Sequence, residues 1–253
     1  RWSYHRGRQF RGTYLADELL TDIPGPAFIK RWRIRRRQRT HFVRRDGVRA
    51  ETWDHVERGY LHLLDLLEVI FQARPFIFGQ RPTLADIGLF GPLFRHFSQD
   101  PDPAAIMWER APAVNEWVAR LWNTCGTDAE DVLVDGVPDD LLPLLREIGQ
   151  THLAYLVGNA RAWQAQKQTF DIDIQGTPYV EVPASRYRVW CLEELQANCR
   201  ALTGAAVDSL RRLLEEQGCW GPLWELQDTA SGYNLDCGAP FADGLKVYDL
   251  EGL

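Results

Sequence analysis

Residues 81–97, RPTLADIGLFGPLFRHF, constrain the fold of this chain more than any other stretch. Thr83 is followed three residues later by Asp86, and apolar side chains then dominate the sequence as far as Phe97. The Thr83 hydroxyl can accept the backbone N–H of Asp86 while the Asp86 carboxylate accepts that of Thr83, so the pair predicts a capping box. We therefore interpret Thr83 and Asp86 as structural N-cap residues. A helix that is apolar around so much of its circumference is expected inside a domain, and Pro92 predicts a kink in it.

Amphipathic helices are predicted on both sides of this stretch. Apolar residues recur at three- and four-residue steps, which is the helical period. The predicted helices cover 46–73, the part of 100–125 that follows a loop and has Pro112 near its first turn, 139–167, 185–202 and 207–218. FDIDI (170–174) and YVEV (179–182) alternate apolar and polar residues around a QGTP turn, which predicts a β-hairpin. The expected fold class is all-α, with one small hairpin.

The composition excludes several classes of protein. Hydrophobic residues make up 45% of the 253 residues, enough for a buried core. No apolar run is long enough to span a bilayer and no signal peptide begins the chain, so we expect no membrane partner. The five cysteines form no C-x-x-C pair, so we expect no metal site and no dithiol redox motif. Reduced thiols favour a cytoplasmic location.

The charge is distributed unevenly. Residues 1–50 carry 14 Lys and Arg against 4 Asp and Glu, whereas the remainder carries 15 against 31. The arginines gather in residues 30–45, which favours either a patch for nucleic acid or phosphate, or a solvated helix face paired with the acidic remainder. Aromatic residues at base-stacking spacing are missing, so we do not expect nucleic acid as the partner.

Two ordered motifs carry a resemblance to a known family. Gly79-Gln80-Arg81-Pro82-Thr83-Leu84-Ala85-Asp86 fits the pattern G-x-x-x-[ST]-x-A-D, and Pro112-Ala113-Val114-Asn115-Glu116-Trp117 fits P-x-[VL]-x-x-W. In this order they resemble the C-terminal helical domain of glutathione S-transferases. The resemblance covers about residues 1–124, which we interpret as one helical bundle. Residues 125–253 are then a mostly helical extension, with the hairpin near 170–182.

The resemblance implies a function for the intact protein. Glutathione would be the co-substrate, a small hydrophobic electrophile the partner, detoxification the role and a homodimer the assembly. The family activates the glutathione thiol in an N-terminal thioredoxin-like domain, and no βαβ pattern of that kind occurs here. Since the chain also begins at Arg1 rather than Met, we expect it to be a fragment that contains no catalytic residue. The alternative is a non-catalytic helical interaction domain of the same family.

The resemblance also implies where substrate would bind. The family's first helix after the thioredoxin-like domain contributes the pocket wall, which makes Trp2, Tyr4, His5 and Arg8 the substrate-binding candidates. Tyr or His could hydrogen-bond a thiolate or a leaving group, and Arg8 could pair with an anionic substrate. An ordinary aromatic-rich helix is the alternative for this segment.

Two further groups of residues have open interpretations. His152, Tyr155 and Asn159 lie on or beside the apolar side of a predicted helix, where satisfied core polar groups are commoner than a ligand site. Arg186, Tyr187 and Arg188 could hold a glutathione carboxylate or form a surface cluster. Cys191 fits a packed small hydrophobe better than a nucleophile.

Overall fold

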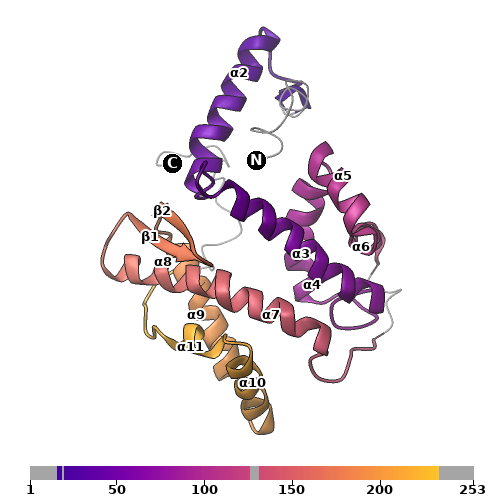
Figure 1. The fold of residues 1–253 in the computed structure, drawn as a ribbon, viewed down its shortest axis with the longest axis vertical. Coiled ribbons are helices and arrows are strands. Elements are labelled where there is room, and N and C mark those ends of the chain that lie inside the picture. Colours follow the sequence, from indigo (N-terminus) through magenta and orange to yellow (C-terminus); the bar gives the residue numbers. More distant parts are fainter. Residues whose placement is uncertain (1–15, 19, 126–130, 234–253) are drawn as a thin grey trace, which may run out of the picture.

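The computed structural model describes residues 16–18, 20–125 and 131–233, which are mostly helical with one small hairpin (Figure 1). The predicted fold class is therefore confirmed for this part of the chain. The first half contains α2 (Ala27–Arg37), η2 (Gln38–Val43), α3 (Trp53–Ala73), α4 (Leu84–Pro92), η3 (Leu93–Phe97), α5 (Pro101–Arg110) and α6 (Pro112–Asn123). The second half contains η4 (Asp139–Leu141), α7 (Leu142–Ile148), η5 (Gly149–Leu153), α8 (Ala154–Gln164), β1 (Thr169–Ile174), β2 (Thr177–Pro183), α9 (Arg186–Arg200), α10 (Ala205–Glu216) and α11 (Trp220–Trp224).

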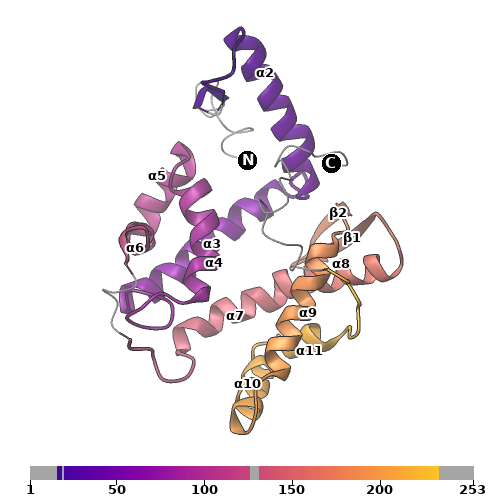
Figure 2. The ribbon, with the colours of Figure 1, turned by 180° about the vertical axis from the view of Figure 1, so that it is seen from behind.

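Two separate clusters of buried side chains hold these elements together. The first lies among α3, α4, η3, α5 and α6, with Leu64, Leu67, Met107, Val114 and Trp117 fully buried. The second lies among η5, α8, α9 and α11, with Leu156, Ala160, Val189 and Leu192 fully buried. Seen from behind, α2 stands at one end of the molecule and α10 at the other (Figure 2).

The helix predicted from residue 46 begins only at Trp53, so the predicted start was wrong. Gly47 has a φ of +76° and its backbone carbonyl accepts the Thr52 hydroxyl at 2.7 Å, which holds residues 47–52 in a turn. A Cβ at Gly47 would lie 2.8 Å from Cδ1 of Tyr179, because the hairpin packs directly against this turn. The periodicity of α3 was visible in the sequence, but this contact was not.

The expectation that the helix after Thr83 is buried was only half right. Leu93 is 2% exposed, but Leu84 is 85% exposed and Ile87 61%. Pro92 has a helical φ of −68°, and the chain continues from it as the π-helical turn η3. The expected irregularity at Pro92 thus takes the form of a wider turn, since proline gives up one helical hydrogen bond.

The segment after residue 100 was predicted as a loop, yet it forms the separate helix α5. Pro101 and Pro103 lie in its first turn, where a missing N–H costs nothing and the fixed φ of proline suits a helix. In the sequence, two prolines close together indicate a loop, although both are compatible with the first turn of a helix.

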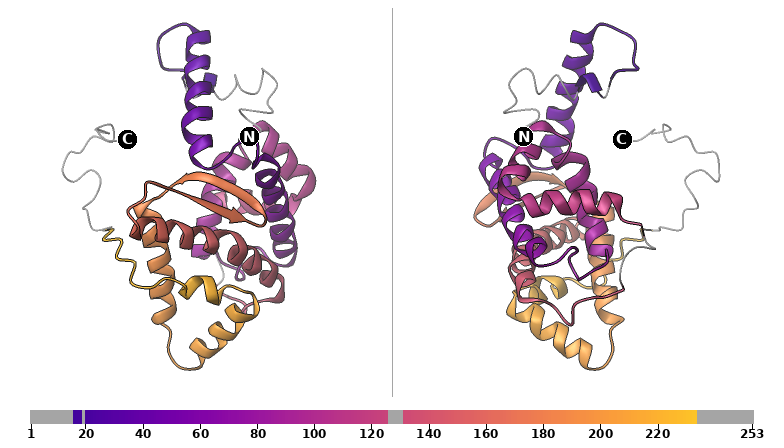
Figure 3. Two further views of the ribbon diagram at one scale, coloured as in Figure 1. Left: turned by 60° about the vertical axis from the view of Figure 1, so that its left-hand side comes forward. Right: turned by 90° about the vertical axis from the view of Figure 1, so that its right-hand side faces the viewer.

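The hairpin is confirmed. Strands β1 and β2 are antiparallel and are joined at Gln175 and Gly176, whose φ values of +52° and +77° suit the tight turn between them. The hairpin lies along α8 (Figure 3). The helix predicted at 139–167 is also present, as η4, α7, η5 and α8 in succession up to Gln164.

Candidate functional site

The four residues predicted to bind substrate, Trp2, Tyr4, His5 and Arg8, lie outside the described residues. Their role stays a prediction. Several arrangements of side chains among the described residues are chemically distinctive.

The first arrangement surrounds Asp86, which is completely buried. Thr83 and Asp86 form the expected capping box. Asp86 Oδ2 accepts the Thr83 N–H and the Thr83 hydroxyl, each at 2.9 Å. Asp86 Oδ1 accepts the Ile77 N–H at 2.9 Å and the Trp117 indole N–H at 3.1 Å. Four donors thus satisfy this buried carboxylate, which joins α4 to α6 and to the preceding loop and has no exposed surface.

The second arrangement is an apolar surface on α4, η3 and α6. The rings of Phe94 and Trp122 stack with centroids 4.6 Å apart, and those of Phe90 and Phe94 with centroids 5.0 Å apart. Trp122 is 63% exposed, and Ile87 lies one helical turn before Phe90 on the same side of α4. We call Ile87, Phe90, Phe94 and Trp122 the α4 face. An exposed aromatic surface of this kind suits an apolar ligand.

The third arrangement is a polar junction between α3, the hairpin and α7. His55 Nε2 lies 3.1 Å from Oε1 of Gln175, whose amide group donates to Glu147 at 3.0 Å. Gln175 Oε1 can only accept, so in the neutral imidazole Nε2 of His55 carries the proton and Nδ1 accepts the Tyr179 hydroxyl at 2.7 Å. Both nitrogens of His55 and the phenol of Tyr179 are therefore engaged. We assign this relay the role of fastening the hairpin to α3.

Arg188 forms a neighbouring cluster with residues of α8 and η5. Its guanidinium donates to the Tyr155 hydroxyl and lies 4.8 Å from the centre of the Tyr155 ring. Burial raises the pKa of Tyr155 and outweighs the charge and hydrogen bond of Arg188, which lower it, while the charge of Asp46 acts in the same direction as burial. Burial together with the positive charge of Arg188 lowers the pKa of His152. The cluster thus keeps the phenol protonated and favours the neutral imidazole.

The structure separates most of the other candidates. Asn159 is buried and satisfied by the Ser185 backbone, accepting its N–H at 2.7 Å and donating to its carbonyl at 2.9 Å. Arg186 donates to the Ser231 carbonyl at 2.8 Å, whereas Arg188 turns to Tyr155. The two arginines therefore do not converge on one anion site.

Tyr187, which lies between these two arginines in the sequence, belongs to a cluster of aromatic side chains. The ring of Tyr187 packs against those of Trp190 and Tyr233, with centroids 5.6 and 5.5 Å away. A hydrogen bond with Cys191 raises the pKa of Tyr187, so Cys191 is a partner within the cluster.

Sequence reasoning missed His55 and Tyr179. They are 124 positions apart, and each is an isolated polar residue in its own element. In the described part of the chain no group of three or more His, Cys, Asp and Glu side chains could hold a metal ion. The helices described here include none that is long and apolar enough to cross a membrane.

The family model for the glutathione S-transferase C-terminal domain matches residues 48–120. The resemblance to this domain is therefore confirmed for residues 48–120. This domain includes α3, α4, η3 and α5, and with them Asp86 and most of the α4 face. Neither a curated protein nor a solved structure matches the chain.

Proposed function

We propose that the protein to which this chain belongs transfers the sulfur of glutathione to a hydrophobic electrophile, and that the α4 face forms part of the electrophile pocket. The match of residues 48–120 to the glutathione S-transferase C-terminal domain carries the proposal. The aromatic stack of half-buried Phe90 and Phe94 with exposed Trp122 supports it, because apolar and aromatic side chains dominate the pockets that bind small apolar ligands.

The chemistry requires an activated thiol. The thiolate is the nucleophile, so the enzyme must lower the pKa of the glutathione thiol. The thiolate sulfur then forms a bond with the electrophilic carbon, the leaving group departs with the bonding electrons, and the thiol proton passes to solvent. None of the arrangements described above offers a free group for activation, so we propose that this group is contributed by a thioredoxin-like domain outside this chain. Trp2, Tyr4, His5 and Arg8 complete the pocket wall in this proposal.

The proposal also covers the cellular location and the oligomeric state. In this proposal glutathione conjugation takes place in the cytoplasm as a detoxification step. The four cysteines that the structure describes are free, which is consistent with a reducing compartment. A homodimer is the proposed assembly, on the family resemblance alone.

Two experiments on the full-length protein test the proposal. Retention on glutathione-agarose and turnover of a chlorinated aromatic substrate are both expected. A protein that is neither retained nor active would contradict the transferase proposal and would favour the non-catalytic interaction domain.

A variant pair tests the α4 face itself. Trp122→Ala is expected to raise the KM for the electrophile several-fold and to leave the KM for glutathione unchanged, because only the apolar partner contacts this face. Trp108→Ala is the matched control, since Trp108 is 70% exposed on α5, outside the α4 face. Equal kinetics in the two variants would exclude the α4 face from the pocket.

A further inference from the structure

Helix α2 presents an unusual set of exposed apolar side chains. It stands at one end of the molecule (Figures 1 and 2), and none of its residues belongs to either buried cluster. Phe28 is 73% exposed and Trp32 60%, and Ile23 and Ile29 are 51% and 42% exposed. All four belong to the N-terminal half of α2 or to the loop that precedes it. We call these four residues the α2 tip.

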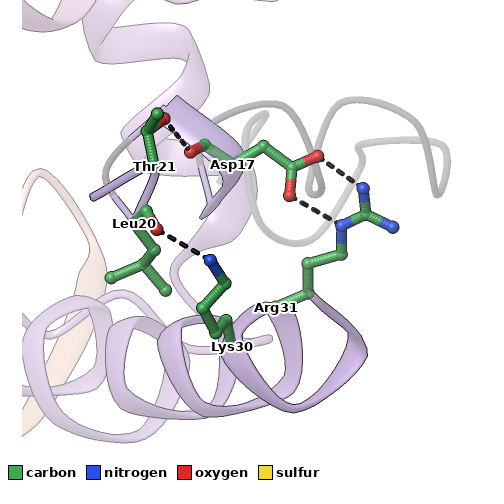
Figure 4. A network of polar contacts seen from close by, with 5 residues as sticks. All are labelled: Asp17, Leu20, Thr21, Lys30 and Arg31. Atoms are coloured by element: carbon green, nitrogen blue, oxygen red, sulfur yellow. Dashed lines mark hydrogen bonds and ion pairs between the residues drawn. The ribbon is translucent and has the colours of Figure 1, made fainter. Parts of the chain in front are cut away.

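Polar contacts hold the α2 tip in place (Figure 4). Lys30 Nζ donates to the carbonyls of Leu20 at 2.9 Å and Ile23 at 2.8 Å. Arg31 forms a two-bond ion pair with Asp17, at 2.7 and 2.6 Å. Lys30 and Arg31 are thus engaged within the protein, and they fix the loop that carries Ile23 against the helix.

The remaining arginines of α2 lie immediately beyond the α2 tip. Residues 27–45 contain nine Lys and Arg and no Asp or Glu. The Arg36 guanidinium lies 5.6 Å from the centre of the Trp32 ring, and Arg33 is exposed. An open groove of about 1140 Å³ runs along the helix and is lined by Ile23, Ile29 and Trp32 together with Arg33 and Arg36. Apolar and cationic groups therefore adjoin each other on one surface.

We propose that α2 docks this protein on an anionic lipid bilayer. The α2 tip enters the boundary between headgroups and acyl chains, and Arg33, Arg35 and Arg36 contact lipid phosphates. This pairing of aromatic and aliphatic side chains with arginines is what an interfacial membrane helix requires. The expectation of no membrane partner rested on the absence of a spanning helix, and interfacial docking needs none.

The same observations favour a bilayer over other polyanions. Ile23 and Ile29 gain nothing from stacking on nucleic-acid bases, whereas both gain from leaving water for acyl chains. The positive charge follows the apolar tip along α2, which matches the order of acyl chain and phosphate in a lipid. The proposal is independent of glutathione chemistry.

Vesicle co-sedimentation of the full chain tests the proposal. Phosphatidylcholine vesicles with added phosphatidylglycerol are expected to bind the protein, and pure phosphatidylcholine vesicles to bind it far less. Phe28→Ser/Trp32→Ser is expected to lower the partition coefficient at least about tenfold, since two apolar side chains no longer enter the bilayer. Arg35→Gln/Arg36→Gln is expected to lower it about fivefold for each charge removed.

Controls separate docking from general adhesion. Trp108→Ser removes an equally exposed aromatic side chain from α5, and Arg95→Gln removes an exposed charge from η3, so both are expected to bind like the parent chain. Thermal unfolding by circular dichroism checks that the α2 variants remain folded. Equal binding to both kinds of vesicle, unchanged binding of Phe28→Ser/Trp32→Ser, or tighter binding to a single-stranded oligonucleotide or an acidic peptide would each overturn the proposal.

Discussion

Replacing Asp86 by alanine tests the role that we assign to this buried carboxylate. The substitution removes the acceptor of four hydrogen bonds at a site with no exposed surface. The Thr83 groups are partly exposed and can turn to water. The Ile77 N–H and the Trp117 indole N–H lie on residues that are 3% and 0% exposed, so both would lose their only partner in this network.

The expected loss of unfolding free energy follows from the Ile77 and Trp117 donors. A buried donor left without a partner costs about 1–3 kcal/mol, so the pair costs about 2–6 kcal/mol. Loss of the cap adds about 1 kcal/mol. We expect Asp86→Ala to lower the free energy of unfolding by about 3–7 kcal/mol, a large part of the ~5–15 kcal/mol typical of a folded domain. Thr83→Ala removes only the hydroxyl and is expected to cost about 0.5–2 kcal/mol.

Urea unfolding followed by far-UV circular dichroism measures these differences, and a double-mutant cycle identifies their cause. Trp117→Phe removes one donor and retains a ring that can stack on Phe71, whose centroid lies 4.6 Å from that of Trp117. In this background Asp86→Ala should cost about 1–3 kcal/mol less. If Asp86→Ala does not fold, Asp86→Asn replaces it, since it keeps one acceptor oxygen. This account would be refuted if Asp86→Ala lowered the unfolding free energy equally in the parent chain and in Trp117→Phe. It would also be refuted if Asp86→Ala cost no more than Thr83→Ala.

Further predictions concern the turn at Gly47 and the pair of His152 and Arg188. Gly47→Ala is expected to lower the unfolding free energy by more than Gly176→Ala. Both glycines have φ near +77°, which costs about 1–2 kcal/mol for alanine, but only Gly47 has a ring, that of Tyr179, 2.8 Å from a new Cβ. Urea unfolding checks the order, and equal costs would contradict it. His152 has a lowered pKa in the folded state, so the unfolded state binds more protons just below pH ~6.5, and stability falls as the pH drops through that range. Arg188→Gln is expected to raise the pKa of His152, measured by NMR titration, and an unchanged pKa would remove Arg188 as a cause.

The local features of the fold could be predicted from the sequence. The capping box depends on two residues three positions apart, and the hairpin depends on alternation around the turn at Gln175 and Gly176. Each signal lies within a few residues, and the same few residues also decide the local structure. This is why the start of α4 and both strands were predicted close to their observed positions.

The candidate site could not be predicted in the same way. Trp117 bonds Asp86 across 31 positions, and His55 meets Tyr179 across 124. No pattern in any of these segments specifies its partner. The packing of α4 against α6 brings Asp86 and Trp117 together, and that of α3 against the hairpin brings His55 and Tyr179 together. The exposure of Ile87 was missed for the same reason: an apolar helix shows that it needs a partner surface, but not whether this chain supplies one.

The two buried clusters contribute mainly to stability, whereas the junction contributes mainly to the relative orientation of the helices. Several polar contacts of residues 139–224 with α3 or with the turn before it are exposed or half-exposed. The ion pair of Arg49 in that turn with Glu181, at 3.0 Å, is an example, and such pairs contribute about 0–1 kcal/mol each. The pair of Arg74 and Asp140 is the more protected one, with the Arg74 side chain 7% exposed. Residues 139–224 therefore owe their stability to the second buried cluster and to Leu141 and Leu144, which pack in the first one. The junction sets the direction in which residues 139–224 leave α3, because directed hydrogen bonds, unlike apolar contacts, fix an angle.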